Sequence, residues 1–124
     1  MKKVVVTDKA PGAIGPYSQG INVGDMFFFS GQIPVNPVTG EMPEGIEAQA
    51  KQSLDNVKAL LESQGMDFSN VIKTTVFLAD MNDFATMNGI YATYFVEPYP
   101  ARSAVQVAKL PKGALIEIEV IAHK

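Results

Sequence analysis

Residues 115–122 read Leu-Ile-Glu-Ile-Glu-Val-Ile-Ala, a strongly alternating pattern that predicts a β-strand. Successive side chains of a β-strand point to opposite faces of the sheet. One face of this predicted strand is therefore wholly apolar, with Ile116, Ile118, Val120 and Ala122. The other face places Glu117 and Glu119 beside Leu115 and Ile121. A face exposed only to water has no need of these aliphatic side chains, so the pattern favours a sheet that another subunit covers.

Two segments have helical periodicity. Residues 47–64 carry one apolar stripe, Ala50, Leu54, Val57 and Leu61, and Gly65 follows where a C-terminal cap belongs. Residues 83–95 carry a second stripe, Phe84, Met87, Tyr91 and Phe95, with Asn82 as the expected N-cap and Pro98 as the stop. Asn88 lies one turn from both Phe84 and Tyr91, so we expect these three side chains to share a face.

The remaining regular segments are strands rich in β-branched and aromatic residues. They are 4–7, 26–30, 71–79, 104–108 and 115–122, with an extra short strand near 19–23. The order β-β-α-β-α-β-β predicts an α+β fold, a mixed sheet with two helices on one face. The length of 124 residues fits a single domain, 1–124.

Composition narrows the function classes. The chain has no cysteine, a net charge of −3, and one histidine, His123. A catalytic triad, a thiolate nucleophile and a zinc site therefore have no candidates, and there is no phosphate-binding loop, so we expect no metal or nucleotide cofactor. No basic stripe suggests nucleic-acid binding. No apolar run approaches a membrane span and no leader is recognisable, so we expect a cytoplasmic protein.

Arg102 is the only arginine and is expected at the start of the 104–108 strand. Its guanidinium fork matches a carboxylate through two parallel hydrogen bonds. Spacing alone leaves two interpretations open: an anchor for a small carboxylate ligand, or a structural ion pair with Glu117 or Glu119. Either glutamate could act as a general base, or could simply face solvent.

Two further segments offer ligand contacts. Tyr17 follows Gly15-Pro16, a rigid turn that could present its ring to a pocket or pack it into the core. Ser30 and Gly31 end the 26–30 strand. Gly31 would let a ligand approach the backbone and meet its N–H, or it could form an ordinary turn.

Taken together, these motifs resemble the Rid (YjgF) family of reactive-intermediate imine deaminases over nearly the whole chain. The matching blocks occur in the family order: Ala13-Ile14-Gly15-Pro16-Tyr17-Ser18-Gln19-Gly20, Ser30-Gly31-Gln32-Ile33-Pro34, Gln52-Ser53-Leu54-Asp55-Asn56-Val57-Lys58, Asp80-Met81-Asn82-Asp83-Phe84 with Asn88, Pro100-Ala101-Arg102-Ser103, Leu110-Pro111-Lys112 and Ile116-Glu117-Ile118-Glu119. The resemblance implies a chorismate-mutase-like fold and a homotrimer whose sheets form a central barrel, with clefts between subunits.

The implied activity is cofactor-independent hydrolysis of 2-iminobutanoate and 2-iminopropanoate to 2-oxo acids and ammonia. By the same resemblance, Arg102 would bind the substrate carboxylate and Glu117 would activate water. The substrate-binding residues that it implies are Tyr17, Ser30, Gly31, Asn88, Tyr91, Arg102 and Ala104. The implied partners are a small 2-imino or 2-oxo acid and further copies of the chain.

The chain departs from the family pattern at two positions. Ala104 stands where many members have cysteine, and Gln106 replaces a common glutamate. If the site uses the main chain at position 104, activity survives. If it uses the cysteine sulfur, this chain lacks the group that the activity needs. The alternative function is a module that binds a 2-oxo acid without turning it over. A third function, RNA cleavage, is disfavoured by the acidic charge and the absence of a histidine in any site.

Overall fold

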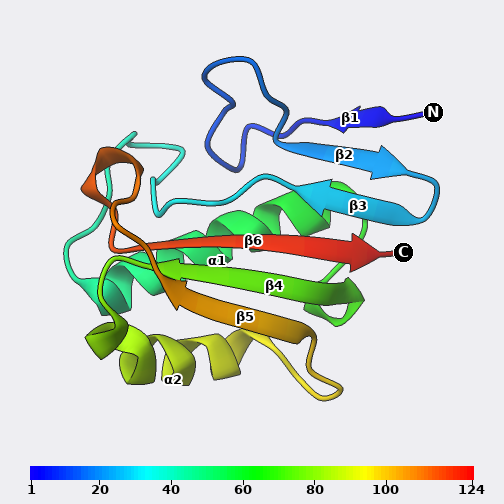
Figure 1. Cartoon of the computed structure of the whole chain (residues 1–124). Helices are drawn as coiled ribbons and strands as arrows, with labels where there is room; N and C mark the ends of the chain where they lie inside the picture. The colour runs from blue at the N-terminus through cyan, green and yellow to red at the C-terminus, as the bar shows by residue number, and fades with distance from the viewer.

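The computed structural model describes residues 1–124, which form a six-stranded sheet and two α-helices (Figure 1). In chain order the elements are β1 (Lys3–Val5), β2 (Gly20–Val23), β3 (Met26–Phe29), α1 (Ile46–Ser63), β4 (Val71–Leu78), α2 (Phe84–Tyr94), β5 (Ala101–Gln106) and β6 (Ile116–His123). Short 3-10 helices occur at Phe68–Asn70, Met81–Asp83 and Pro111–Gly113. The predicted α+β class is confirmed, including the extra strand β2. No helix has the length and apolar character needed to cross a membrane.

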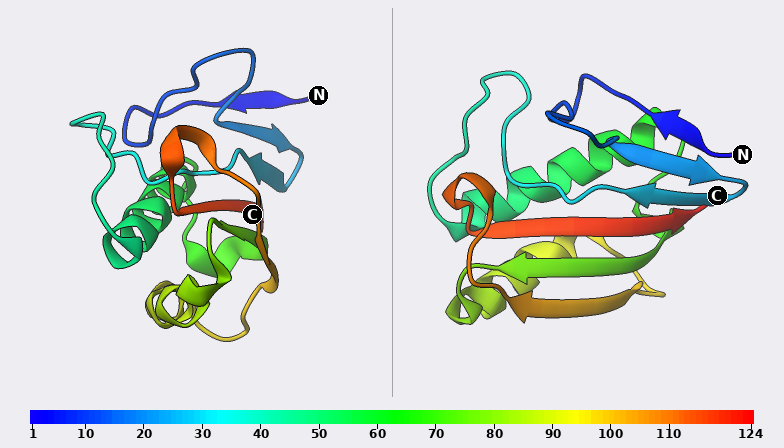
Figure 2. Two further views of the ribbon diagram at one scale, coloured as in Figure 1. Left: turned by 60° about the vertical axis from the view of Figure 1, so that its left-hand side comes forward. Right: turned by 45° about the horizontal axis from the view of Figure 1, so that its top comes forward.

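The sheet order is β1-β2-β3-β6-β4-β5, with β4 and β5 parallel and all other pairs antiparallel. The predicted alternation of β6 is confirmed. Ile116, Ile118 and Ala122 are 0% exposed, whereas Glu119 on the other face is exposed. Both helices pack on the same face of the sheet, as Figure 2 shows, and the opposite face, which we call the open face, has no helix.

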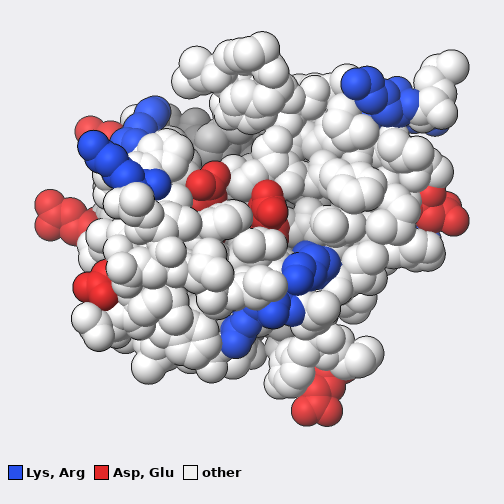
Figure 3. Space-filling model, in the orientation of Figure 1, with Lys and Arg blue, Asp and Glu red and all other residues white.

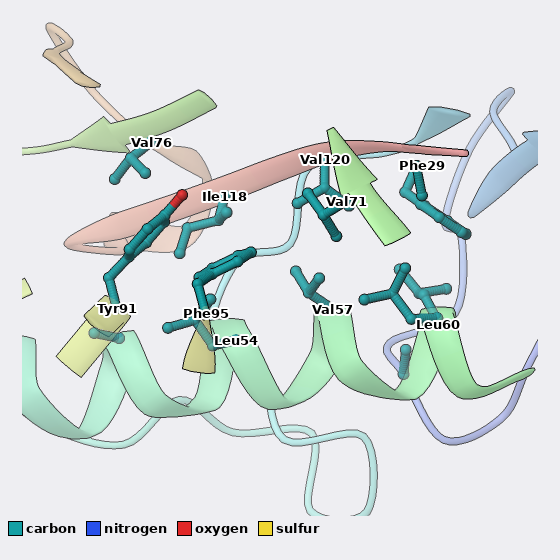
Figure 4. Packing of buried hydrophobic residues seen from close by; sticks show 14 of the residues in the cluster. Phe29, Leu54, Val57, Leu60, Val71, Val76, Tyr91, Phe95, Ile118 and Val120 are labelled. Atoms are coloured by element: carbon teal, nitrogen blue, oxygen red, sulfur yellow. The ribbon is translucent and has the colours of Figure 1, made fainter. Parts of the chain in front are cut away.

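The apolar stripe of α1 forms the centre of the core. Ala50, Leu54, Val57 and Leu61 are at most 1% exposed, and Figure 4 shows Leu54 and Val57 pointing from α1 toward the sheet. The helix ends as predicted. Gly65 has φ +71°, the N–H of Gly65 donates to Glu62 O and that of Met66 donates to Leu61 O. This is the Schellman arrangement that a left-handed glycine permits.

Two boundaries differ from prediction. Asn82 does not cap α2: its N–H donates to the Asp80 side chain at 2.9 Å, so Asp80 caps a 3-10 turn that precedes the helix. The strand expected at 104–108 instead spans 101–106, because hydrogen bonding to β4 sets its limits rather than its apolar content. Arg102 therefore lies within β5, directly beside Thr74 of β4.

A second, polar stripe of α1 is also buried. Gln49, Ser53 and Asn56 are at most 6% exposed, and all three bond to loop backbone. Ser53 Oγ donates to Gln32 O at 2.7 Å, and Asn56 Nδ2 donates to Val35 O at 2.9 Å and to Ile33 O at 3.2 Å. The stripe therefore fixes residues 32–35 on the helix.

Replacement of Asn56 by alanine should lower the free energy of unfolding by about 1–3 kcal/mol, because buried carbonyls lose their donor. Urea denaturation measures this change. Lys58→Ala, an exposed change on the same helix, is the control and should stay within about 0.5 kcal/mol of the parent. Equal stabilities for the two variants would contradict the anchoring role of Asn56.

Candidate functional site

A cavity of about 670 Å³ opens between the N-terminal loop, the end of β3, residues 33–40 and the 3-10 turn at 111–113. Four of the predicted site residues line it: Tyr17, Ser30, Gly31 and Glu117. Its only charged lining residues are Glu117 and Lys112. Lys112 was not predicted as a site residue. Its left-handed backbone, with φ 57°, marks a strained position of the kind that functional sites retain.

Glu117 lies directly against Gly31. A Cβ at position 31 would lie 2.9 Å from Glu117 Cδ and closer still to Oε2, so a larger residue there would displace the carboxylate from this position. Gly31 was expected to admit a ligand to the backbone, and in this chain it also admits Glu117. No hydrogen bond within the chain uses the N–H of Gly31, whereas that of Ser30 donates to Gln19 O.

Burial raises the pKa of Glu117 above its usual value, and the nearby Glu119 carboxylate raises it further. Both effects disfavour the charged form. A carboxylate with a raised pKa is a stronger base, and so accepts a proton from water more readily than an ordinary surface glutamate does. Glu117 therefore has the electrostatic character of a general base.

Hydrogen bonds from Gln19 hold the loop that carries Tyr17. The Gln19 amide is buried and donates to Thr7 O and Pro11 O, both at 2.9 Å, while its oxygen accepts from the N–H of Thr7 at 2.7 Å. Ser30 Oγ donates to Ser18 O at 2.6 Å. The turn at Gly15 has φ +114°, which glycine adopts without strain. Tyr17 is thus held at the cavity rim with its ring half exposed.

The other predicted site residues surround Arg102 beneath β5. Arg102 Nη1 donates to Asn88 Oδ1 at 2.6 Å. The guanidinium carbon lies 4.8 Å from the ring centroid of Tyr91 and 5.4 Å from that of Phe84. The prediction that Phe84, Asn88 and Tyr91 share a face of the helix is confirmed, since all three contact Arg102. Phe84 was not predicted as a site residue. Ala104, two residues along β5, packs against the core.

Arg102 forms no ion pair. The one salt bridge of the chain joins Lys51 and Glu47, so the proposed pairing of Arg102 with Glu117 or Glu119 is absent. A guanidinium has five N–H donors, and Asn88 occupies one side of it. The rest of the fork is available to a carboxylate from outside the chain.

The two groups of site residues lie on opposite faces of the sheet. Arg102 aligns with the buried Thr74 and so faces the helices, whereas Glu117 aligns with Phe77 on the open face. Figure 3 views the open face and shows acidic groups near its centre, with basic groups beside them toward β5. Within one chain the sheet therefore separates the Arg102 side chain from the Glu117 side chain.

Known proteins resemble this chain over its whole length. A profile of the family described as Endoribonuclease L-PSP matches residues 7–124. The 2-iminobutanoate/2-iminopropanoate deaminase of Escherichia coli (strain K12) is 56% identical over 125 residues, 98% of each chain. The crystal structure of E. coli TdcF with bound serine is 53% identical, with a TM-score of 0.94 over 98% of each chain. That of the YjgF gene product from E. coli is 55% identical, again with a TM-score of 0.94 over 98% of each chain.

Substitution of Glu119 by glutamine should lower the pKa of Glu117, because it removes the like charge that helps to raise it. At any fixed pH within its titration range, Glu117 should then be more fully ionised. Titration of the side-chain carboxyl carbons by NMR measures the change. Glu41→Gln, on an exposed loop, serves as the control. An unchanged Glu117 pKa in the Glu119 variant would show that the two carboxylates do not interact.

Proposed function

The chain belongs to the Rid (YjgF) family, whose profile is described as Endoribonuclease L-PSP, and on that premise we propose that it is a 2-iminobutanoate/2-iminopropanoate deaminase. It hydrolyses reactive 2-imino acids and their enamine tautomers to 2-oxo acids and ammonia. The observation that carries this function is Arg102, a lone arginine held by Asn88 and Tyr91 and left without a carboxylate partner. Such a group is suited to bind the carboxylate that every 2-imino acid carries.

The reaction requires only water and positioned groups. Arg102 binds the substrate carboxylate and fixes the C=N carbon near Glu117. Glu117 takes a proton from a water molecule while the oxygen of that water bonds to the C=N carbon. Glu117 gives this proton to the nitrogen, which leaves a tetrahedral intermediate with a hydroxyl and an amino group on one carbon. The hydroxyl proton then passes through Glu117 to the nitrogen, the C–N bond breaks, and ammonia leaves as the carbonyl forms. Imines hydrolyse without a catalyst, so lowering the barrier by a few kcal/mol, at about 1.4 kcal/mol per tenfold in rate, is sufficient.

The active protein is a homotrimer with its sites between subunits and its sheets around a central barrel. Arg102 and Glu117 occupy opposite faces of one sheet, so a complete site needs Arg102 from one subunit and Glu117 from the next. The open face supports this assembly: it exposes Phe28 and Val105, at 46% and 44%, alongside its glutamates. Large apolar side chains on an open sheet favour cover by another copy of the chain.

The remaining site residues shape the cleft. Tyr17 covers the small apolar side chain of the substrate, and the Gly31 N–H, with Ser30 beside it, contacts the substrate. Asn88 and Tyr91 complete the wall around Arg102. Ala104 contributes its main chain where many relatives have cysteine. We place the protein in the cytoplasm as a single domain, 1–124, that acts without a cofactor and binds neither nucleic acid nor membrane.

The purified protein should accelerate the loss of 2-iminobutanoate that a threonine dehydratase generates, measured as faster release of 2-oxobutanoate. Arg102→Ala should abolish the acceleration, because the substrate carboxylate loses its partner. Arg102→Lys should retain part of it, since the charge remains without the fork. Lys58→Ala is the control for a lost surface cation. Binding of 2-oxobutanoate with no acceleration would instead identify a non-catalytic binding module.

Mixing two inactive variants should restore activity if sites lie between subunits. Trimers assembled from equal amounts of Arg102→Ala and Glu117→Gln chains combine an intact Arg102 with an intact Glu117 in about a quarter of their sites. The co-refolded mixture should therefore recover roughly a quarter of the parent activity. Sedimentation confirms that both variants remain trimeric. If co-refolded trimers stay inactive, each site is built within one chain.

A further inference from the structure

A buried pair of hydroxyl groups lies beneath Arg102. Thr74 is 0% exposed, and its Oγ1 is 2.8 Å from the hydroxyl oxygen of Tyr91. Figure 4 shows Tyr91 extending from α2 toward the sheet with its oxygen at the sheet end. The next inward-facing residues of β4, Val76 and Leu78, are aliphatic. Thr74 is therefore a polar side chain on an otherwise apolar stretch of strand.

Packing alone does not account for this threonine. Valine has nearly the same shape and would avoid the cost of burying a hydroxyl group. What threonine adds is a partner for the Tyr91 hydroxyl, which needs one when it is buried. Burial raises the pKa of Tyr91, so its phenol remains protonated and the hydrogen bond persists at neutral pH.

The Tyr91 ring connects this pair to Arg102. The ring stacks on Phe95 at a centroid distance of 4.3 Å, and the Arg102 guanidinium carbon lies 4.8 Å from its centroid. Thr74 is also the residue of β4 that aligns with Arg102 of β5. The hydrogen bond between the Thr74 and Tyr91 hydroxyl groups therefore fixes one end of the Tyr91 ring, and the Arg102 guanidinium packs against the face of that ring.

We propose that Thr74 is a positioning residue for substrate binding, which holds Tyr91 to the sheet and thereby fixes the Arg102 guanidinium for the substrate carboxylate. This inference rests on the proposed function. A free arginine side chain has many rotamers, and fixing it before the ligand arrives reduces the entropy lost on binding. Thr74 should consequently affect binding and leave the chemical step, at Glu117, unchanged.

The test compares Thr74→Val with Thr74→Ser. Thr74→Val should raise both KM for 2-iminobutanoate and Kd for 2-oxobutanoate about fivefold, with kcat within about twofold of the parent. Thr74→Ser keeps the hydroxyl and should restore KM. Thr93→Val removes a threonine hydroxyl on α2 that bonds only to Ile90 O, and it is the matched control. A fall in kcat at unchanged KM would overturn the proposal.

A double variant tests whether Thr74 acts through Tyr91. Tyr91→Phe breaks the same hydrogen bond from the other side, and it also provides the measurement if Thr74→Val does not fold. The KM of Thr74→Val/Tyr91→Phe should match that of either single variant, because the bond can be lost only once. Multiplied effects would overturn the proposal. So would an unchanged KM in Tyr91→Phe.

The Kd of 2-oxobutanoate, measured by isothermal titration calorimetry, does not depend on turnover. It therefore separates this inference from the proposed function. A parent protein that binds 2-oxobutanoate without hydrolysing the imine would refute the deaminase, and the Thr74 variants would still weaken binding if Thr74 positions Arg102. Active protein with unaltered Kd and KM in Thr74→Val would refute the positioning role alone. A parent that neither binds nor hydrolyses would overturn both.

Discussion

The pleat of the β-sheet is the constraint on which the rest of the molecule depends. Neighbouring residues of a strand point to opposite faces, and the register of β4 with β5 and β6 fixes which face each side chain takes. Arg102 faces the helices and Glu117 faces away from them. The same alternation that builds the core under α1 and α2 thus places Arg102 and Glu117 on opposite faces of one sheet, which is why the proposed site combines residues of two subunits.

Each half of the site is held by polar groups that the core encloses. On the cavity side, Ser53 and Asn56 of α1 anchor residues 32–35, and Gln19 anchors the loop that carries Tyr17. Every buried side-chain nitrogen or oxygen of the chain has a hydrogen-bond partner. Satisfied buried polar groups favour one loop arrangement over others, since any alternative leaves a donor or acceptor unpaired. The cavity wall is therefore prepared before a ligand binds.

The arginine half is prepared in a different way. Aromatic faces of Phe84 and Tyr91 lie against the guanidinium, and Asn88 accepts one of its hydrogen bonds. None of these groups carries a negative charge, so the cation is oriented without being neutralised. That arrangement explains how the chain keeps its only arginine available to an external carboxylate although two glutamates lie on the same sheet.

The amino-acid sequence alone predicts those elements whose signals are local. The stripe of α1, the left-handed Gly65 and the alternation of β6 follow from periods of 3.6 and 2 and from the freedom of glycine. It also placed Phe84, Asn88 and Tyr91 on one face. It does not predict the limits of β5, which depend on pairing with β4. Nor does it predict that Asp80, rather than Asn82, is the capping residue and that it caps the 3-10 turn before α2. The folded chain was needed to show that Arg102 has no ion pair, that Gly31 accommodates Glu117 and that Thr74 bonds to Tyr91. These features depend on residues distant in sequence, and sheet register and helix packing determine whether such residues meet.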